Sequence, residues 1–398
     1  MVQGRNFHSK KIYDAVHGFI RFDEEERELI NTYAFQRLRY IHQLGLSYLI
    51  YPGASHTRFE HSLGVMELTS RIFEALMQSV RPDLFHFIPR KGSAEYFYWQ
   101  KVLRLAALCH DLGHLPFSHV AERELLPVLG HEEWTLKIIR SEALEAVFEK
   151  IAKKALFSEN LSGRDLVEDI IKLALGEEKL SRLEPKKKHP FTNLEKVLSQ
   201  IIVGDFFGAD RIDYLLRDSI CTGISYGLMD YQHLIEMLRI LPKSTDDPEL
   251  VLGIDENGLE SCEALALARH FMYRRVYQHP SVRAFNFHLK RFMRTYYQQK
   301  NILTGLDSYL LVNDSDLIHF LKLAYLDRSL PGHLDAKIIF ERKNHFKAIP
   351  LSDKIDEKIL LTIKEKNNLQ EADMQWEISE GVREEHLSFP VLRKHLPL

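Results

Sequence analysis

The sequence has little cysteine and no long hydrophobic run. Its three cysteines, Cys109, Cys221 and Cys262, are too few and too scattered for a disulfide framework or a zinc knuckle. No run of about 18 or more apolar residues occurs, so no transmembrane helix is predicted. The first residues, MVQGRNFHSKK, lack the apolar core of a signal peptide. A reducing, cytoplasmic location is therefore expected, with no membrane as a partner.

A strong excess of charge of one sign is also missing. The formal net charge is −3 over 398 residues, so no global field attracts nucleic acid, which is not indicated as a partner. Any phosphate site has to be a local basic cluster. The apolar fraction of 45% and the charged fraction of 27% are ordinary for a globular protein. The length predicts two or three domains of roughly 150 residues each.

Histidine, by contrast, is concentrated in one part of the chain. Eight of the 20 histidines lie between residues 42 and 131, which is under a quarter of the sequence. The stretch CHDLGHLPFSH, residues 109–119, alone holds three histidines and an aspartate. Such a gathering of imidazoles and a carboxylate marks this region as the candidate site of chemistry.

Hydrophobic spacing predicts a mainly α fold with a smaller α+β C-terminal region, and a division between residues 1–300 and 301–398. Helices are expected over 24–43, from 61 onward, over 97–110, over 132–180 as two or three amphipathic helices, over 194–218 and over 261–278. Extended segments are expected over 10–22 with a turn at Gly18, over 251–260 as a hairpin around 256–258, over 336–341 and near the C-terminus.

His110 and Asp111 are adjacent at the expected end of a buried helix. Neighbours on a helix lie about 100° apart, but at a helix end both side chains can turn toward one point. Imidazole nitrogen with carboxylate oxygen suits iron, manganese, zinc and similar ions better than calcium. Two ligands leave a metal incompletely coordinated. The further candidates are His61 and one of three aspartates that spacing does not separate: Asp205, Asp210 and Asp213.

Two of the expected helices carry polar stripes. On GDFFGADRIDYLLRDS, the residues at helical spacing are Asp210, Tyr214, Arg217 and Asp218. This stripe is either a solvated face with an Asp–Arg pair or a buried polar face that needs a ligand. On RHFMYRRVYQH, the stripe consists of Arg269, Tyr273 and Tyr277. It is either surface packing of cations on aromatics or a clamp for a triphosphate beside a ring that stacks on a base or sugar.

The motifs RFEHSLGV, CHDLGHLPFSH and ADRIDYLLRDS, in this order, resemble the signature of the HD-domain metal phosphohydrolases. The longer runs QLGLSYLIYPGASHTRFEHSLGV and MYRRVYQH are similar to the deoxynucleoside triphosphate triphosphohydrolase branch, which includes bacterial dGTPase-like enzymes and the catalytic core of the animal SAM-and-HD-domain dNTPase. The resemblance covers about residues 10–135 and 200–285. It implies an HD-domain catalytic core within 1–300, with metal motifs at 58–65, 109–119 and 205–218 and a substrate helix at 261–279.

The resemblance implies hydrolysis of deoxynucleoside triphosphates to deoxynucleoside and inorganic triphosphate, with a divalent ion (Fe, Mn, Mg, Zn or Ni) as cofactor. The implied metal ligands are His61, His110, Asp111 and Asp210. The implied catalytic residues are His114, His119, His131 and Glu122. His119 is expected to protonate the leaving 5′ oxygen, since the pKa of histidine lies near working pH. Glu122 is expected to orient an imidazole.

The resemblance also implies contacts to the substrate. These fall on Gln43, Leu44, Arg58, Arg211, Tyr214, Asp218, Arg269, Tyr273, Tyr277 and Gln278. Tyr214 and Asp218 match a pair that binds the sugar and favours deoxyribose. Arg211 stands where the animal enzyme has lysine, which keeps the charge and changes the geometry.

Relatives in this branch imply a homo-oligomer, a dimer or tetramer, with a nucleotide activator at a subunit interface. At the guanine-binding positions, Gln36 and Arg39 are kept, but an acid and an asparagine are replaced by Asn31 and Tyr13. Without the acid, a guanine-specific activator is not expected. The rival interpretations are another HD-type phosphohydrolase, either a phosphomonoesterase or a phosphodiesterase, and a regulator that binds nucleotide or nucleic acid without catalysis. Residues 301–398 are expected to serve oligomerisation or regulation.

Overall fold

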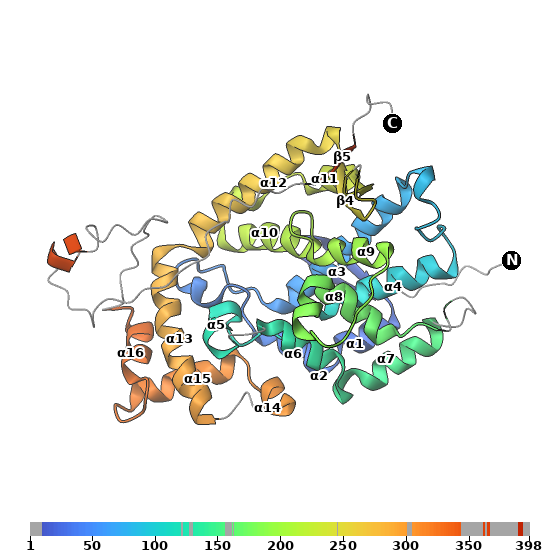
Figure 1. Cartoon of the computed structure of the whole chain (residues 1–398). Helices are drawn as coiled ribbons and strands as arrows, with labels where there is room; N and C mark the ends of the chain where they lie inside the picture. The colour runs from blue at the N-terminus through green and yellow to red at the C-terminus, as the bar shows by residue number, and fades with distance from the viewer. Residues whose placement is uncertain are drawn as a thin grey trace.

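The computed structural model describes residues 10–120, 122–126, 130–155, 161, 163–244, 246–300, 305–343, 361–362, 364–366 and 389–392. Helices dominate these residues, as Figure 1 shows, so the expectation of a mainly α protein is confirmed. The expected division at residue 300 stays a prediction.

The N-terminal part is a hairpin followed by short helical segments. The strands β1 (Lys10–Asp14) and β2 (Gly18–Phe22) pair antiparallel, which confirms the extended entry. The expected single helix over 24–43 is wrong. The chain instead forms α1 (Glu24–Ile30), α2 (Tyr33–Gln36) and a 3-10 turn, because Asp23 and Thr32 each begin a new helix by accepting a backbone N–H.

A bundle of long helices forms the main hydrophobic core. Its helices are α3 (Arg58–Gln78), α4 (Ala94–Cys109), α8 (Leu166–Leu183), α9 (Asn193–Val203) and α10 (Ala209–Thr222). The helix α3 begins at a capping box between Thr57 and Glu60. The helix α4 is buried almost all round, as its sequence predicts. Three smaller helices, α5 (Glu122–Leu125), α6 (Gly130–Ile139) and α7 (Glu142–Ala155), connect α4 to α8.

The expected continuous helix over 194–218 is wrong. The chain leaves the helical conformation at Gly204, whose φ of −59° and ψ of 139° are extended, and α10 begins after Gly208. A Cβ added at Gly208 would lie 2.7 Å from the carbonyl oxygens of Ile202 and Gly204, so the turn requires glycine. The break puts Asp210 in the first turn of a separate helix, at the site described below.

The segment after α10 contains a small sheet and two further helices. The helix α11 (Tyr231–Met237) leads to β3 (Leu238–Pro242), which pairs antiparallel with β4 (Leu250–Asp255). The expected hairpin turn at 256–258 is therefore wrong: these residues are a 3-10 turn, capped by Asp255, that leads into α12 (Leu259–Met272). One π-helical turn, Tyr273–Tyr277, follows α12.

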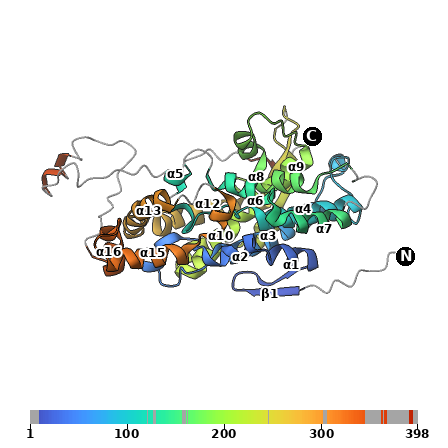
Figure 2. The same ribbon diagram turned by 90° about the horizontal axis from the view of Figure 1, so that it is seen from below.

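Four helices after the π-helical turn build a second hydrophobic core. They are α13 (Pro280–Lys300), α14 (Leu306–Leu311), α15 (Asp314–Leu326) and α16 (His333–Glu341). The strand expected at 336–341 is wrong, because these residues lie in α16. A two-residue strand near the C-terminus, β5 (Val391–Leu392), pairs parallel with β4. Figures 1 and 2 both place α13, α15 and α16 at one end of the molecule, away from α4 and α7.

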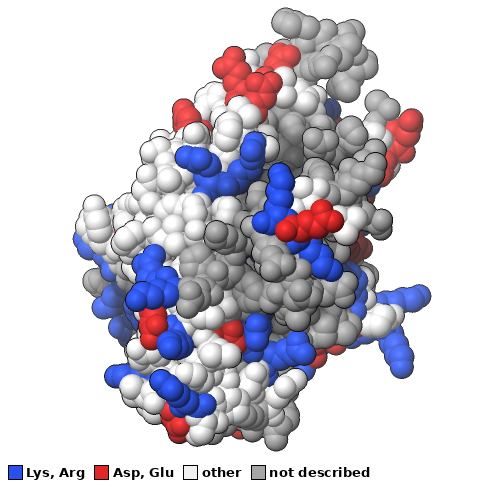
Figure 3. All heavy atoms as spheres, turned by 90° about the vertical axis from the view of Figure 1, so that its left-hand side faces the viewer, with Lys and Arg blue, Asp and Glu red and all other residues white. Residues whose placement is uncertain are grey.

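The surface at the α16 end is electrostatically mixed. Figure 3 shows lysine and arginine in separate groups with acidic side chains among them on the described part of this face. This is unlike the continuous basic stripe of many nucleic-acid-binding proteins. Among the residues that the structure describes, none of the helices combines the length and apolar character needed to cross a lipid bilayer.

Candidate active site

Four candidate metal ligands meet where three helices of the main core converge. His61 lies in the second turn of α3, His110 and Asp111 directly follow α4, and Asp210 lies in the first turn of α10. The Nε2 atom of His61 lies 3.0 Å from Asp210 Oδ1 and 3.5 Å from Asp111 Oδ2. The Nε2 atom of His110 lies 3.8 Å and 3.5 Å from the same two carboxylates. The structure therefore brings together residues that are 149 positions apart in the chain.

The two imidazoles are oriented as metal ligands would be. The Nε2 atoms of His61 and His110 are buried and form no hydrogen bond within the described part of the chain. Each Nδ1 atom is engaged from behind, by Asp213 at 2.8 Å for His61 and by the carbonyl of Ala107 at 2.7 Å for His110. These contacts orient the two rings so that each Nε2 faces the carboxylates, as in a histidine that binds a metal through Nε2. With a carboxylate oxygen of Asp210, the two imidazoles form a cluster that fits a divalent transition metal, and Asp111 lies 3.5 Å from both Nε2 atoms.

The three aspartates that the sequence leaves equivalent have different surroundings. Asp205 is exposed in the turn between α9 and α10. Asp213 is fully buried and faces the far side of His61, where it also contacts His17 and Arg217. Only Asp210, of the three, lies against the Nε2 atoms of the imidazoles. The geometry thus favours Asp210 as the ligand and makes Asp213 the residue that orients His61.

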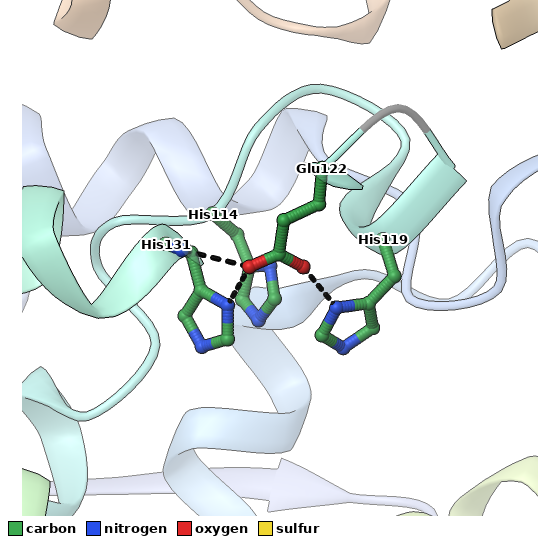
Figure 4. Close-up of side chains that lie close together, drawn as sticks. All are labelled: His114, His119, Glu122 and His131. Carbon is green, nitrogen blue, oxygen red and sulfur yellow. Dashed lines mark hydrogen bonds and ion pairs between the residues drawn. The ribbon is translucent and has the colours of Figure 1, made fainter. Parts of the chain in front are cut away.

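The second cluster consists of three histidines around Glu122, as Figure 4 shows. Glu122 Oε1 accepts from the backbone N–H of His131 at 2.7 Å and contacts its Nδ1 at 2.6 Å, while Oε2 contacts Nδ1 of His119. The ring of His114 stacks on that of His131 with centroids 3.7 Å apart. His114 also links the two clusters, since its Nε2 lies 3.3 Å from Asp111.

The three imidazoles have different electrostatic environments. Burial, with the charge of Arg58, holds the pKa of His114 well below its usual range. Burial also acts to lower the pKa of His131, but the charge of Glu122 outweighs it and the pKa is raised. The side chain of His119 is 62% exposed, whereas that of His114 is only 1% exposed. His114 is therefore suited to a neutral role, and His119 is the one of the three most accessible to a ligand.

A cationic and aromatic surface lies close to Asp210, one of the candidate metal ligands. The nitrogens Nε and Nη1 of Arg211 and Nε of Arg269 are buried without a hydrogen bond to any described residue. The guanidinium of Arg269 lies over the ring of Tyr273, 5.6 Å from its centroid, and Tyr273 packs edge-on against Tyr277. The ring of Tyr277 in turn contacts that of Tyr214, with centroids 6.1 Å apart. Buried guanidinium nitrogens that have no hydrogen-bond partner are suited to binding an anion.

Asp218 lies at the inner end of this surface. Its Oδ2 accepts from the hydroxyl of Tyr277 at 2.7 Å, and its Oδ1 contacts His56 Nε2 at 2.7 Å. Burial acts to lower the pKa of His56, but the hydrogen bond and charge of Asp218 outweigh it and raise the pKa to about 9. His56 is therefore a cation that fixes the orientation of the Asp218 carboxylate.

The remaining predicted contacts lie around the same space. Arg58 is buried and already engaged, because its Nη1 donates to Asp111 at 2.5 Å and its Nε to Ser118 at 2.9 Å. The Oε1 atom of Gln43 is buried and has no hydrogen-bond partner among the described residues. Leu44 and Gln278 are half-buried, at the start of a 3-10 turn and at the end of the π-helical turn.

The predicted activator positions lie away from the metal ligands, on the N-terminal part. Tyr13 is 73% exposed on β1, and Asn31 is exposed at the end of α1. Gln36 donates to the carbonyl of Ile30 at 2.7 Å and accepts from Arg39 at 2.8 Å. These polar side chains are thus held in place at the surface.

Sequence reasoning missed His17 and His56 as parts of the site. His17 comes from the hairpin turn and lies 2.6 Å from Asp213, although nothing in its sequence context indicates this. His56 is one of the eight clustered histidines, and this enrichment was a signal that could have identified it.

Comparison with known proteins agrees with this geometry. The model of the HD domain matches residues 58–201, and the model of the HD-associated region matches residues 229–385. An uncharacterized protein of Methanocaldococcus jannaschii is 32% identical over 361 residues, which cover 89% of this chain and 65% of that protein. Human deoxynucleoside triphosphate triphosphohydrolase SAMHD1 is 31% identical over 282 residues, which cover 68% of this chain and 42% of that protein.

A solved structure is similar over most of its length. The crystal structure of a hypothetical protein from Aquifex aeolicus superposes with a TM-score of 0.70 at 32% identity, covering 92% of this chain and 84% of that one. The chain spans about two fifths to two thirds of the length of these two curated relatives. With both family regions present in order, the chain belongs to the HD-domain family.

Proposed function

We propose that the chain hydrolyses deoxynucleoside triphosphates to deoxynucleoside and inorganic triphosphate, as a metal-dependent hydrolase of the HD superfamily. The observation that carries the proposal is the set of buried, unpartnered nitrogens on the candidate ligands His61 and His110 and on Arg211 and Arg269. Arg211 follows the candidate ligand Asp210 directly, so a polyphosphate bound by the arginines would reach the metal ligands. The similarity to SAMHD1 supports a deoxynucleoside triphosphate as the substrate.

The metal would be held by His61, His110, Asp111 and Asp210, and it would supply a Lewis acid that lowers the pKa of water and screens phosphate charge. The family and the donor set fit a divalent ion and do not name it. The chain's own residues make the site rigid. Arg58 pairs with Asp111, and Asp213 orients the ring of His61.

In the proposed reaction, water adds to the α-phosphorus and the bond from phosphorus to the 5′ oxygen breaks. The leaving 5′ oxygen then needs a proton, for which His119 is the proposed donor. Glu122 engages Nδ1 of His119, so Nε2 is the nitrogen that would face the substrate. His131 shares the same carboxylate, and His114 carries the contact onward to Asp111.

The sugar would lie against Tyr214, Tyr277 and Asp218. A carboxylate has about four lone-pair positions, so Asp218 can accept from a 3′ hydroxyl while it contacts Tyr277 and His56. The ring of Tyr214 packs against that of Tyr277, and in this position it would crowd a 2′ hydroxyl. Preference for deoxyribose over ribose follows from that crowding.

Product analysis tests the proposal. The purified chain is incubated with Mn²⁺ or Fe²⁺ and each of the four deoxynucleoside triphosphates, singly and in mixtures, and the products are separated by ion-exchange chromatography. Deoxynucleoside and triphosphate are expected in equal amounts. Release of phosphate or pyrophosphate would instead establish a different HD-type phosphohydrolase. Faster turnover in mixtures than with single substrates would support a nucleotide activator, and sedimentation measures the proposed dimer or tetramer.

Arginine variants test how the triphosphate is bound. Arg211→Ala and Arg269→Ala are each expected to raise KM by about tenfold to a hundredfold, because a charge-assisted hydrogen bond contributes about 1.5–3 kcal/mol. Arg274→Ala is the matched control, since Arg274 lies on the same turn as Tyr273 and is exposed. Equal effects of all three substitutions on KM would contradict the assignment of the buried guanidinium groups to phosphate.

A further inference from the structure

The loop that follows α4 contains backbone strain. Phe117 has a φ of 58° and Ser118 a φ of 57°, and neither is glycine. Left-handed backbone is costly for such residues and persists only where the surroundings impose it. This strained pair lies between His114 and His119, so the conformation of the pair sets where both imidazoles point.

The side chain that imposes the strain comes from the other end of the chain. Asp314, the first residue of α15, is 2% exposed. Its Oδ1 accepts from the backbone N–H of Phe117 at 2.7 Å. Its Oδ2 accepts from the backbone N–H of His42 at 2.8 Å and contacts His42 Nδ1 at 2.6 Å. One carboxylate thus ties the strained loop to the segment that precedes Gln43.

A further contact from the same segment, and a bridge through Arg37, hold the loop at its other end. The hydroxyl of Tyr309 donates to the carbonyl of Gly113. Arg37 donates from Nε to the carbonyl of Val312 at 3.0 Å and from Nη1 to the carbonyl of His114 at 2.9 Å. The segment 309–314 therefore holds the loop on both sides of His114.

The apolar side chains of the loop are divided between the two hydrophobic cores. Leu115 and Phe117 are fully buried, and they belong to the second core with Leu317 and Leu321 of α15. Leu112, only three residues earlier, belongs to the main core. Burial raises the pKa of Asp314, although the hydrogen bonds from His42 and Phe117 oppose this. A buried carboxylate whose desolvation penalty is not fully offset lowers the stability of the fold, so stability alone does not explain its presence here.

We infer that Asp314 is a positioning residue: it fixes the left-handed backbone at Phe117 and so holds His114 and His119 against the substrate. Residues 309–314 of the HD-associated region thereby complete an active site whose metal ligands all lie before residue 211. This role rests on the proposed function for its kinetic consequence. The conformational consequence, an ordered loop over 113–118, is independent of the reaction.

The variants Asp314→Ala and Asp314→Asn test the inference in the full-length chain. Asp314→Ala removes the acceptor for all three groups, and kcat for triphosphate release is expected to fall roughly tenfold to a hundredfold, since a displacement of about 1 Å can cost this much. KM is expected to change less than kcat, because Arg211 and Arg269, the proposed phosphate contacts, are untouched. Backbone hydrogen exchange over 113–118 should accelerate at least about tenfold, while metal stoichiometry stays at the wild-type value. Asp314→Asn keeps the shape and should show smaller changes in the same directions, and it replaces the alanine variant if that variant does not fold.

Asp316→Ala is the matched control. Asp316 lies in the same turn of α15 and accepts from the backbone N–H of Asn313 at 3.0 Å, so its loss weakens the helix cap without touching the loop. Wild-type kcat and wild-type exchange over 113–118 are expected for it. The inference is overturned if Asp314→Asn and Asp314→Ala exchange like the wild type over 113–118, or if Asp316→Ala reproduces their effects.

The two proposals fail in different ways. If the wild-type chain releases no triphosphate from any of the four substrates, the proposed function fails, and the exchange data still decide the role of Asp314. If the wild type is active and the variants keep its kcat with their exchange unchanged, only the positioning role fails.

Discussion

Individual side chains in this protein act mainly through the neighbours that orient them. His61 presents Nε2 to the carboxylates because Asp213 takes its Nδ1, and Asp213 is in turn held by His17 and Arg217. Arg217 also donates to Asp14 at 2.8 Å, which extends the buried network to the N-terminal hairpin. An adjacent residue pair such as His110–Asp111 suggests a metal site, but it does not show which groups set the geometry.

Asp213→Asn is expected to lower metal affinity by about tenfold to a hundredfold, the usual effect of losing the partner of a ligating histidine. The amide has only one accepting oxygen, so it cannot serve His61, His17 and Arg217 together. Titration calorimetry with Mn²⁺ measures the affinity.

The control for this variant is Asp14→Asn, which removes the other carboxylate of Arg217 and has no contact with His61. Both substitutions are expected to lower thermal stability, but only Asp213→Asn should weaken metal binding. Equal metal affinities in the two variants would exclude an orienting role for Asp213.

At the scale of elements, the chemistry lies at helix ends that are brought together by close helix crossings. The end of α4 supplies His110 and Asp111, and the start of α10 supplies Asp210. The helices α3 and α10 approach closely at Gly64, where an added Cβ would collide with the side chains of Asp213 and Arg217. The glycine in RFEHSLGV is therefore needed for the approach of α10 rather than for a turn.

Gly64→Ala is expected to destabilise the chain by about 1–3 kcal/mol, as overpacking of a dense interior usually does. It should also weaken Mn²⁺ binding, because the displaced groups are those that orient His61. Urea unfolding and calorimetry measure the two effects. Gly163→Ala serves as the control, since an added Cβ there meets nothing within 4 Å among the described residues. If Gly64→Ala has wild-type stability, α10 can move away from α3 without a loss in the free energy of unfolding.

At the scale of the whole molecule, two hydrophobic cores meet at the loop after α4. Leu112 and the buried residues of α4 pack into the main core, whereas Leu115, Phe117 and Trp134 pack with α13 and α15. The ring of Trp134 stacks on that of Tyr309 with centroids 3.8 Å apart. The loop 113–118 is therefore a shared boundary, and its order depends on both parts of the chain.

The stability of the whole molecule should depend on the charge of His56. Its pKa is about 9 in the folded chain and about 6.5 when unfolded, so protonated His56 stabilises the fold fully below pH 6.5. This contribution is lost as the pH rises from 6.5 through 9, and it amounts to at most about 3 kcal/mol.

The measurement compares urea unfolding of the wild type and His56→Gln from pH 6 to 10 at fixed metal concentration. The difference between their unfolding free energies isolates His56 from other titrating groups. That difference should shrink as the pH rises. A difference that is independent of pH would show that His56 is not a cation in the folded chain.

The sequence by itself determined the mainly helical class, the buried α4 and the motifs that carry the chemistry. Local spacing suffices for these, because the apolar period and the residue types are properties of short segments. It could not determine where Gly204 and Gly208 break a helix, nor that 336–341 is helical, because both depend on what packs against the segment.

Tertiary structure alone decided which groups converge. It separated Asp210 from Asp205 and Asp213, brought His17 to the back of His61, and placed Asp314 under a loop nearly 200 residues earlier. Spacing along a helix fixes the face on which a side chain lies, but not which distant helix that face meets. The pairing of distant helices follows from the packing of two hydrophobic cores around one loop, and the sequence pattern of a short segment does not encode that packing.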